Sequence, residues 1–253
     1  MYAEERRQLI AERARRDGRV EVATLATELD VTTETVRRDL TDLEHRGLLR
    51  RVHGGAIPVE RLRSEPDVAE RAVRQADEKA RIAAAALAEL PAGGTIILDA
   101  GTTTGALASI LPNDRPLTVV TNAVTIALTV STRPNIELHL VGGRVRGRTL
   151  ATVEDWALRT LDDLAVDVAF VATNGLSVAR GLTTPDPAEA AVKRALVRSG
   201  RRVVLLADHS KIGQDHFVRF AELGDVDRFI TDAGIDPRDR GELAAAGLEV
   251  VLA

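Results

Sequence analysis

The sequence predicts an α/β protein of two unequal domains, a small helical domain at the N-terminus and a larger domain with a mostly parallel sheet. A chain of 253 residues, 45% of them hydrophobic, can bury a substantial core and is long enough for two domains. Residues 1–57 contain apolar residues at helical spacings, whereas residues 69–253 alternate short β-rich apolar runs with helical stretches. Between them, residues 58–68 carry two prolines and many charged residues, which is typical of a linker.

Composition excludes several classes of protein and site. No apolar run reaches the roughly 18 to 20 residues of a membrane span, and the charged N-terminus has no signal-peptide core, so we expect a cytoplasmic protein without membrane association. The absence of cysteine excludes disulfides, thiolate zinc sites and thiol nucleophiles. The five histidines lack metal-ligand spacing, and no GxGxxG, Walker, HExxH or GxSxG motif occurs. We therefore predict no metal site, no catalytic residues and no bound cofactor.

The N-terminal domain is predicted to contain three short helices and a hairpin. Residues 4–16 and 22–29 each carry an amphipathic stripe, and Thr32 can cap a third helix that ends at Arg46-Gly47. Only about three residues separate the second helix from the third, a helix-turn-helix spacing that projects the outer face of the third helix. Residues 48–56 are typical of a short β-hairpin. Together these elements predict a winged helix.

The outer face of the third helix and the hairpin are the candidate DNA-binding surface. The net charge of −4 gives no indication of nucleic-acid binding, but five arginines and two histidines fall within residues 37–53. We expect the helix to enter the major groove and the hairpin to contact phosphates. A solvated helix surface is the alternative on charge alone, and one of the paired arginines could instead support the fold by pairing with Asp39 or Glu44. The candidate DNA-binding residues are Thr32, Thr33, Thr35, Arg37, Arg38, Arg50, Arg51 and His53.

The larger domain is predicted to hold mostly parallel strands covered by helices on both faces. The predicted strands are 95–99, 117–121, 136–141, 168–173, 202–208, 228–231 and 248–252. The predicted helices are 77–90, 104–111, 123–131, 187–199 and 237–246.

Glycines, hydroxyls, amides and cations follow several of these strands, and the carboxyl ends of parallel strands meet at one edge of a sheet. The turn from Gly101 to Thr104 opens a helix, so its free amides and hydroxyls suit a phosphate or carboxylate. An ordinary turn with a threonine cap is the alternative. The candidate effector-binding residues are Asp99, Gly101, Thr102, Thr103, Thr104, Thr121, Asn122, Gly142, Gly143, Arg144, Asn174, Gly175, Asp208 and Lys211.

Two groups of motifs resemble one family over essentially the whole chain. Residues 31–40 (VTTETVRRDL), Leu43-Glu44 and residues 51–56 (RVHGGA) closely resemble the DNA-binding signature of DeoR/GlpR-type repressors. The sensor domain of that family is resembled by four shorter motifs. These are residues 99–103 (DAGTT), 121–122 (TN), 141–143 (VGG) and 208–211 (DHSK).

The resemblance implies a sensor fold similar to ribose-5-phosphate isomerase and glucosamine-6-phosphate deaminase, and an inducer that is a phosphorylated sugar. Residues 181–193 look like those of members that control fructose uptake, which makes fructose 1-phosphate a candidate. Glu189 and Lys193 within that segment stand i, i+4 on a helix, and we favour a surface ion pair for them. The sequence departs from the family pattern at Glu154-Asp155, where many members have a glycine.

The sequence therefore predicts a repressor of a sugar-metabolism operon that a phosphorylated sugar releases from double-stranded operator DNA. The footprint of one winged helix is small, so we expect a homodimer or homotetramer, assembled through the sensor domain. The rival is a sugar-phosphate isomerase or deaminase with an accessory DNA domain, in which Asp99, Glu154, Asp155 or Asp208 could supply carboxylates. A nicotinamide-nucleotide sensor is disfavoured by the missing glycine fingerprint.

Overall fold

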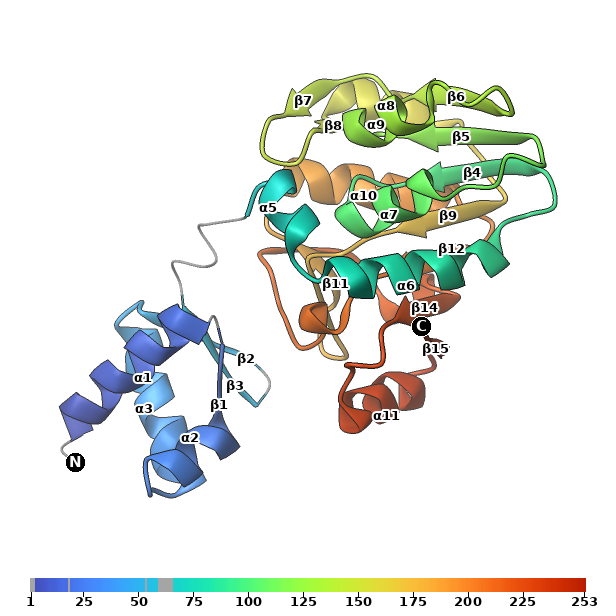
Figure 1. Cartoon of the computed structure of the whole chain (residues 1–253). Helices are drawn as coiled ribbons and strands as arrows, with labels where there is room; N and C mark the ends of the chain where they lie inside the picture. The colour runs from blue at the N-terminus through green and yellow to red at the C-terminus, as the bar shows by residue number, and fades with distance from the viewer. Residues whose placement is uncertain (1–2, 18, 53, 59–65) are drawn as a thin grey trace. The chain divides into compact units, whose positions relative to one another are not determined.

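The chain folds into two compact units, Met1–Glu65 and Pro66–Ala253 (Figure 1). The computed structural model describes residues 3–17, 19–52, 54–58 and 66–253. Most of the predicted linker, residues 59–65, lies outside the described residues, and Val68 at its end begins a helix. No described helix combines the length and the apolar character that crossing a membrane requires. Each unit is described by itself below.

The first unit has the predicted winged-helix elements. Its helices are α1 (Ala3–Asp17), α2 (Val22–Glu28) and α3 (Thr33–His45). The predicted hairpin is formed by β2 (Leu49–Val52) and β3 (Gly55–Pro58). The sequence pattern did not predict β1 (Val20–Glu21), which adds to β3 as a third antiparallel strand, because two residues carry no periodicity.

Local chemistry sets both ends of α3 and the position of the hairpin. The Thr32 hydroxyl accepts the Thr35 amide at 3.1 Å, which satisfies one free donor of the first turn. At the other end, Gly47 has a φ of +68°, and the Leu48 amide donates to the Leu43 carbonyl at 3.0 Å, as in a Schellman motif. A Cβ on Gly55 would lie 1.9 Å from the Val20 carbonyl oxygen, so only glycine allows β1 and β3 to pair this closely.

The second unit is built on a parallel sheet of seven strands, and all seven predicted strands are confirmed. The order across the sheet is β15-β14-β12-β9-β4-β5-β6, and every neighbouring pair is parallel. Of these seven strands, β4 comes first along the chain, and it lies near the middle of the sheet, beside β9. The bounds are β4 Gly94–Leu98, β5 Leu117–Thr121, β6 Ile136–Leu140, β9 Val168–Val171, β12 Val203–Leu206, β14 Arg228–Thr231 and β15 Val250–Leu252.

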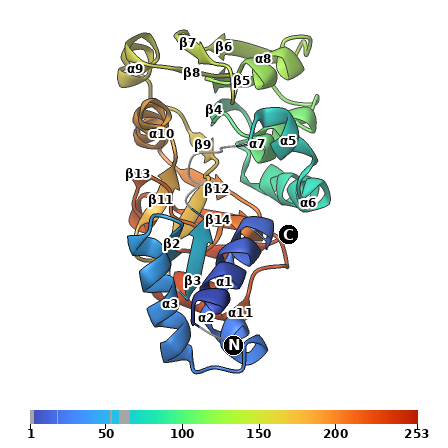
Figure 2. The ribbon, with the colours of Figure 1, turned by 90° about the vertical axis from the view of Figure 1, so that its left-hand side faces the viewer.

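Helices cover both faces of this sheet, and each face has its own hydrophobic core (Figure 2). One core packs against α6 (Ala76–Ala86), α7 (Thr102–Ser109) and α8 (Val124–Val130). The other packs against α9 (Asp155–Asp162), α10 (Pro187–Ser199) and α11 (Pro237–Ala245). Strands of three to five residues alternate with these helices, and the inner strands are largely buried, as expected for a sheet covered on both sides.

Several short elements were not predicted. Two antiparallel pieces lie outside the main sheet, and most of their strands have only three or four residues, too few for a periodic pattern. These strands are β7 (Arg144–Arg146) with β8 (Ala151–Val153), and β10 (Gly175–Ser177) with β11 (Gly181–Thr184) and β13 (Val218–Ala221). The short helices are α5 (Val68–Val73), η2 (His209–Lys211) and η3 (Leu223–Asp225), whereas η1 (Leu87–Glu89) is the last turn of the predicted helix 77–90.

Candidate functional site

The outer face of α3 carries most of the residues that were predicted to contact DNA. Val36, Leu40 and Leu43 are buried in the core of the first unit, while Thr33, Arg37 and Arg38 on the other side of the helix are exposed. Thr32 and Thr35 form the cap, and their hydroxyls lie 2.9 Å apart. The helix therefore presents a polar, basic surface to solvent.

Neither arginine of the Arg37-Arg38 pair supports the fold through Asp39, so that alternative is wrong. The buried Asp39 carboxylate is held instead by two arginines of α1, with the Arg6 Nε at 2.5 Å and the Arg7 Nε at 3.1 Å. Arg37 reaches Glu34 at 3.6 Å in an exposed pair, an interaction that contributes little. For Arg38 the structure records no ion pair within the described part of the chain.

The hairpin places one further predicted residue beside α3. The Arg51 amide donates to the Glu44 carboxylate at 2.9 Å, and its guanidinium donates to the Thr41 hydroxyl at 3.0 Å. The Glu44 carboxylate therefore holds the hairpin against α3. It does not bind the side chain of Arg37 or Arg38. The Arg50 side chain and His53 lie outside the described residues.

The strand order of the sheet places a topological switch point between β4 and β9. From β4 the chain continues to β5 and β6 on one side, and from β9 it continues to β12, β14 and β15 on the other. The loops that leave the carboxyl ends of β4 and β9 run apart, and ligands of open α/β sheets bind at such switch points. Asp99 follows β4 directly, and Ala172 follows β9 directly.

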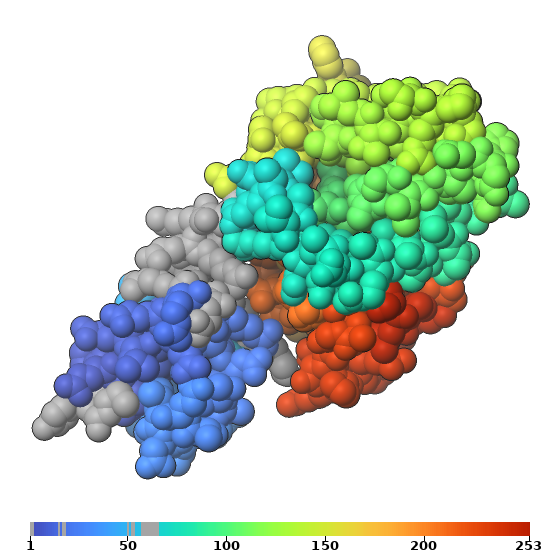
Figure 3. Space-filling view, in the orientation of Figure 1, coloured from blue at the N-terminus to red at the C-terminus, as the bar shows by residue number. Residues whose placement is uncertain are grey.

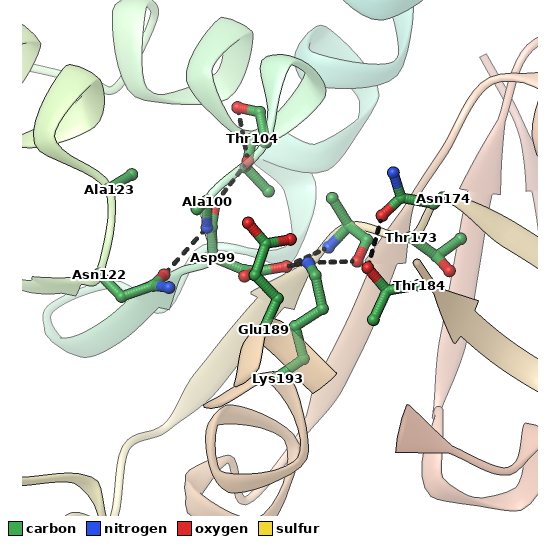
Figure 4. Close-up of polar contacts among 12 residues, drawn as sticks. Asp99, Ala100, Thr104, Asn122, Ala123, Thr173, Asn174, Thr184, Glu189 and Lys193 are labelled. Atoms are coloured by element: carbon green, nitrogen blue, oxygen red, sulfur yellow. Dashed lines mark hydrogen bonds and ion pairs between the residues drawn. The ribbon is translucent and has the colours of Figure 1, made fainter. Parts of the chain in front are cut away.

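A buried ion pair occupies this switch point. The Lys193 ammonium from α10 binds Asp99 Oδ2 and donates to the Ala172 carbonyl at 3.0 Å (Figure 4). The Ala172 amide donates to the same Oδ2 at 3.0 Å, whereas no protein group within the described chain bonds Asp99 Oδ1. Burial raises the pKa of the Asp99 carboxyl, and this effect exceeds the opposing influence of Lys193 and the Ala172 amide.

Glu189 stands one helical turn before Lys193 and is also buried. Its carboxylate accepts the Thr149 hydroxyl and the Arg146 guanidinium, the latter at 3.2 Å, and its charge acts to raise the pKa of Asp99. The predicted surface ion pair between Glu189 and Lys193 is therefore wrong, because the two side chains are buried and bind different partners. Asp99, Ala172, Glu189 and Lys193 are called the switch-point cluster below.

The N-terminus of α7 lies directly after Asp99. Gly101 is the N-cap and provides no side chain, so the amides at the start of the helix have no capping side chain. A Cβ at Gly101 would lie 2.8 Å from the Ala172 Cβ, so glycine allows the two strand ends to meet. The Thr104 hydroxyl donates within the turn, to Asp99 O at 2.7 Å, whereas Thr102 stays partly exposed and Thr103 is buried. Free amides and a helix dipole can hold an anion here.

Two predicted polar residues after β5 brace this turn. The Thr121 hydroxyl donates to the Leu98 carbonyl at 2.6 Å. Asn122 Oδ1 accepts the Ala100 amide at 3.0 Å, and its Nδ2 donates to the Thr152 carbonyl at 3.4 Å. Both side chains are buried, so they fix the position of the loop between β4 and α7.

The loop after β9 brings Asn174 close to the switch-point cluster (Figure 4). Asn174 Oδ1 accepts the Thr184 hydroxyl at 2.9 Å, which leaves its amide NH2 as a further donor. A Cβ on Gly175 would lie 2.3 Å from the Gln214 carbonyl oxygen. Gly175 therefore allows close backbone packing in this loop.

The predicted residues 142–144 lie at the β7–β8 hairpin. Gly143 has a φ of +142°, and a Cβ there would be 2.7 Å from the Val153 carbonyl oxygen, whereas Gly142 has open space around it. Arg144 is exposed and pairs with Glu154 at 2.7 Å. Glu154 has a φ of +76° and a ψ of −169°, a conformation that is essentially restricted to glycine. Glu154 lies within the segment where the sequence departs from the family pattern, and its backbone there is strained.

A second polar group forms at the end of β12. Asp208 is buried and accepts the Ser210 amide at 3.1 Å. Lys79 of α6 is buried nearby and donates to the Arg71 carbonyl at 2.5 Å. Burial lowers the pKa of Lys79, Asp208 opposes that shift, and Lys211 adds to it. Among the described residues, neither Asp208 nor Lys79 forms a hydrogen bond or ion pair with the switch-point cluster. The described chain has no cluster of His, Asp or Glu suited to a metal.

Comparison with known families gives one result for each unit. A model of the DeoR-like helix-turn-helix domain matches residues 6–61, and a model of the DeoR C-terminal sensor domain matches residues 74–233. The chain belongs to the DeoR family of transcriptional regulators. Both halves of the predicted resemblance are confirmed.

Similar DeoR-family regulators cover nearly the full chain. The HTH-type transcriptional regulator GlpR of Haloferax volcanii is 40% identical over 98% of this chain and 97% of that protein. The uncharacterized HTH-type transcriptional regulator FruR of Bacillus subtilis is 37% identical over 92% of each. The glycerol-3-phosphate regulon repressor of Escherichia coli is 32% identical over 88% of each. All three relatives are named as regulators or repressors. Their names support a regulatory role for this chain over the isomerase alternative.

Two solved structures match this DeoR-family chain at much lower sequence identity. Ribose 5-phosphate isomerase A from Methanocaldococcus jannaschii covers 55% of each chain with a TM-score of 0.40 and 17% identity. A probable sor operon regulator from Shigella flexneri covers 67% of this chain and 90% of that chain, with a TM-score of 0.46 and 13% identity.

Proposed function

We propose that this DeoR-family protein represses a sugar-metabolism operon and that a phosphorylated sugar releases it from double-stranded operator DNA. The observation that carries the effector half is Asp99 Oδ1, a buried carboxylate oxygen without a protein partner, beside the free amides of α7. A carboxylate accepts hydroxyl protons, and helix amides bind phosphate oxygens. A polyol that carries a phosphate supplies both groups in one molecule.

The roles of the remaining residues follow from their positions. The amides of Thr102 and Thr103 and the Thr102 hydroxyl bind the phosphate. Asp99 accepts a sugar hydroxyl, and the free amide NH2 of Asn174 donates to another. Fructose 1-phosphate is our first candidate, a choice supported by the resemblance of residues 181–193 and by the name of the FruR relative. Glycerol 3-phosphate is the alternative that the E. coli relative suggests.

On the DNA side, α3 enters the major groove with Thr33, Arg37 and Arg38 near base edges, and Arg51 contacts a phosphate. One winged helix covers a short site, so the protein binds as a homodimer or homotetramer with half-sites about 34 to 36 Å apart or a multiple of that. The sugar phosphate must bind better to the form that fits the operator less well. A coupling of about 1 to 3 kcal/mol then weakens operator binding several-fold to about a hundredfold.

Fluorescence anisotropy on the DNA upstream of its own gene, at fixed salt, tests both halves. Each phosphorylated sugar is titrated beside its unphosphorylated form, and a scrambled duplex serves as the DNA control. We expect release by one phosphorylated sugar alone. Asp99→Asn should abolish that release, whereas Asp114→Asn, which changes an exposed aspartate, should not. Equal affinity for the scrambled duplex would refute the DNA half, and tight binding that no sugar phosphate disturbs would refute the effector half.

A further inference from the structure

The strand β6 forms one edge of the seven-stranded sheet, and its outer side has no neighbouring strand within the described chain. In the space-filling view, the yellow-green segment that contains α8 and β6 forms the upper rim of the molecule (Figure 3). An open edge exposes amides and carbonyls that can pair with another strand.

The hydrogen bonds to β5 identify which groups of β6 point outward. Leu117 N donates to Asn135 O at 3.0 Å, and Val141 N donates to Thr121 O at 2.9 Å, so the odd-numbered residues face β5. The backbone groups of Ile136, Leu138 and Leu140 therefore face away from the sheet, because successive residues of a strand alternate. The Ile136 amide is already used, on the Arg133 carbonyl at 3.1 Å.

The side chains along this edge are self-complementary. The sequence Ile136-Glu137-Leu138-His139-Leu140 is symmetric about Leu138 in apolar character and has a carboxylate and an imidazole at its two polar positions. If two such strands pair antiparallel with Leu138 opposite Leu138, each Glu137 lies opposite His139 of the other copy. These are positions of a non-hydrogen-bonded pair, where side chains approach closely, while Leu138 and its copy exchange both backbone bonds.

We propose that two copies of this chain associate by antiparallel pairing of their β6 strands about a two-fold axis at Leu138. The pairing joins two sheets into one and is isologous, so it closes as a dimer. Leu138 exchanges two hydrogen bonds with its copy, and each Leu140 amide donates to the opposite Ile136 carbonyl. The Glu137 and His139 side chains are 73% and 57% exposed, so both are free to turn from their present contact at 3.3 Å toward the other copy.

The helices beside this edge enlarge the contact. Figure 2 shows α8 and α9 on opposite faces of the sheet near β6. Under the proposed symmetry each helix approaches its own copy across the axis. Leu140 at the end of this strand is 49% exposed and adds apolar surface at this edge. A second copy is the occupant we infer, because the strand is complementary to itself at both polar positions in one register.

A charge-exchange experiment on the full-length protein tests the pairing. Glu137→Lys removes the carboxylate and places a lysine opposite each imidazole, and His139→Glu places two negative charges opposite each other. We expect each variant alone to raise the dimer Kd by about tenfold at pH 6. An equimolar mixture restores both pairs, so native mass spectrometry should show mainly the mixed dimer. A fault in folding of either chain could not be repaired by mixing.

A backbone variant gives a second readout. Leu138→Pro removes the outward amide without removing a hydrogen bond to β5, so the sheet should form and the dimer should be lost. Leu252→Pro is the matched control, because it removes an outward amide from β15 at the other edge of the sheet and should leave the dimer Kd unchanged. Sedimentation is measured without DNA or sugar phosphate. The inference rests on the homo-oligomer of the proposed function, but its failure would leave the effector proposal intact.

A wild-type chain that sediments as a monomer at micromolar concentration would overturn the pairing. So would a dimer whose Kd is unchanged in both charge variants, or a mixture with no preference for the mixed dimer. If Leu138→Pro fails to fold, the mixing experiment decides alone.

Discussion

The buried pair between Lys193 and Asp99 gives the sharpest test of how the sensor unit works. The two side chains are 5% and 0% exposed, so solvent does not screen the pair. Removing one partner of such a pair costs about 3 to 5 kcal/mol, because the other charge stays buried alone. Lys193→Met should therefore lower the free energy of unfolding by about that amount at pH 8. The double change Asp99→Asn with Lys193→Met removes both charges and should recover most of the loss.

The cost of Lys193→Met should also depend on pH. The pKa of Asp99 is raised in the folded protein by burial, so the folded state binds a proton more tightly than the unfolded chain. The Asp99 carboxyl therefore lowers the stability of the folded state as the pH rises from the ordinary pKa of 3.8 through the raised pKa. Above the raised pKa, this loss of stability stays constant. Without Lys193 the pKa of Asp99 in the folded state rises further, and each additional pKa unit corresponds to about 1.4 kcal/mol. The deficit of the variant should be smaller at pH 5 than at pH 8.

Urea unfolding at the two pH values measures the stabilities, and operator anisotropy with the active sugar phosphate measures function. The double variant should fold and bind operator but should not be released by the sugar. Arg238→Met, which breaks an exposed pair on α11, is the matched control and should change stability by less than about 0.5 kcal/mol. Normal release of the double variant, or a Lys193→Met protein as stable as wild type at pH 8, would refute the role assigned to the pair.

Three further predictions use single features of the fold. Glu154→Gly should be more stable to urea than Glu154→Ala by about 1 to 2 kcal/mol, because both lose the ion pair but only glycine accepts the positive φ; equal stabilities would argue against strain at this residue. Arg37→Ala and Arg38→Ala should each weaken operator binding by about 1 to 3 kcal/mol in anisotropy while sugar binding persists, and Arg46→Ala, whose guanidinium is bound by α1, should keep the preference for operator over scrambled DNA. Gly55→Ala should destabilise the first unit by about 1 to 3 kcal/mol in thermal unfolding, since the new Cβ would meet a backbone carbonyl of β1, and an unchanged transition would contradict that packing.

The sequence allowed the strands of the main sheet to be predicted because each is a short, β-rich stretch of three to five residues, mostly apolar, between turns and helical stretches. The order of these strands was not predictable in the same way. Pairing of β4 with β9 joins residues about seventy positions apart, and no local pattern carries that information. The switch point, which depends on this order, therefore emerged only from the structure.

The same limit explains which site residues were found. Asp99, Gly101 and Asn122 were predicted because they directly follow strands, and strand ends meet at one edge. Glu189 and Lys193 were misassigned because charged residues at i, i+4 usually form exposed pairs. A signal was available, since both lie in line with the buried Ala190, Leu196 and Val197 on one side of α10. A charge within an apolar helical stripe indicates a buried polar site.

The contacts of α10 suggest how the proposed site and the proposed dimer edge are linked. Lys193 of α10 binds Asp99 within the switch-point cluster. Later in the same helix, the Ser199 hydroxyl donates to the Leu161 carbonyl of α9 at 3.2 Å. The helix α9 also contacts β8, and β8 pairs with β7, the next strand along the chain after β6, where we place the second copy. A ligand that draws Asp99 toward its own hydroxyls changes the anchor of α10 at one end, and α10 contacts α9 at the other. Because a shift in equilibrium requires differential affinity, such a ligand acts on DNA binding only if the two dimer arrangements hold α10 differently.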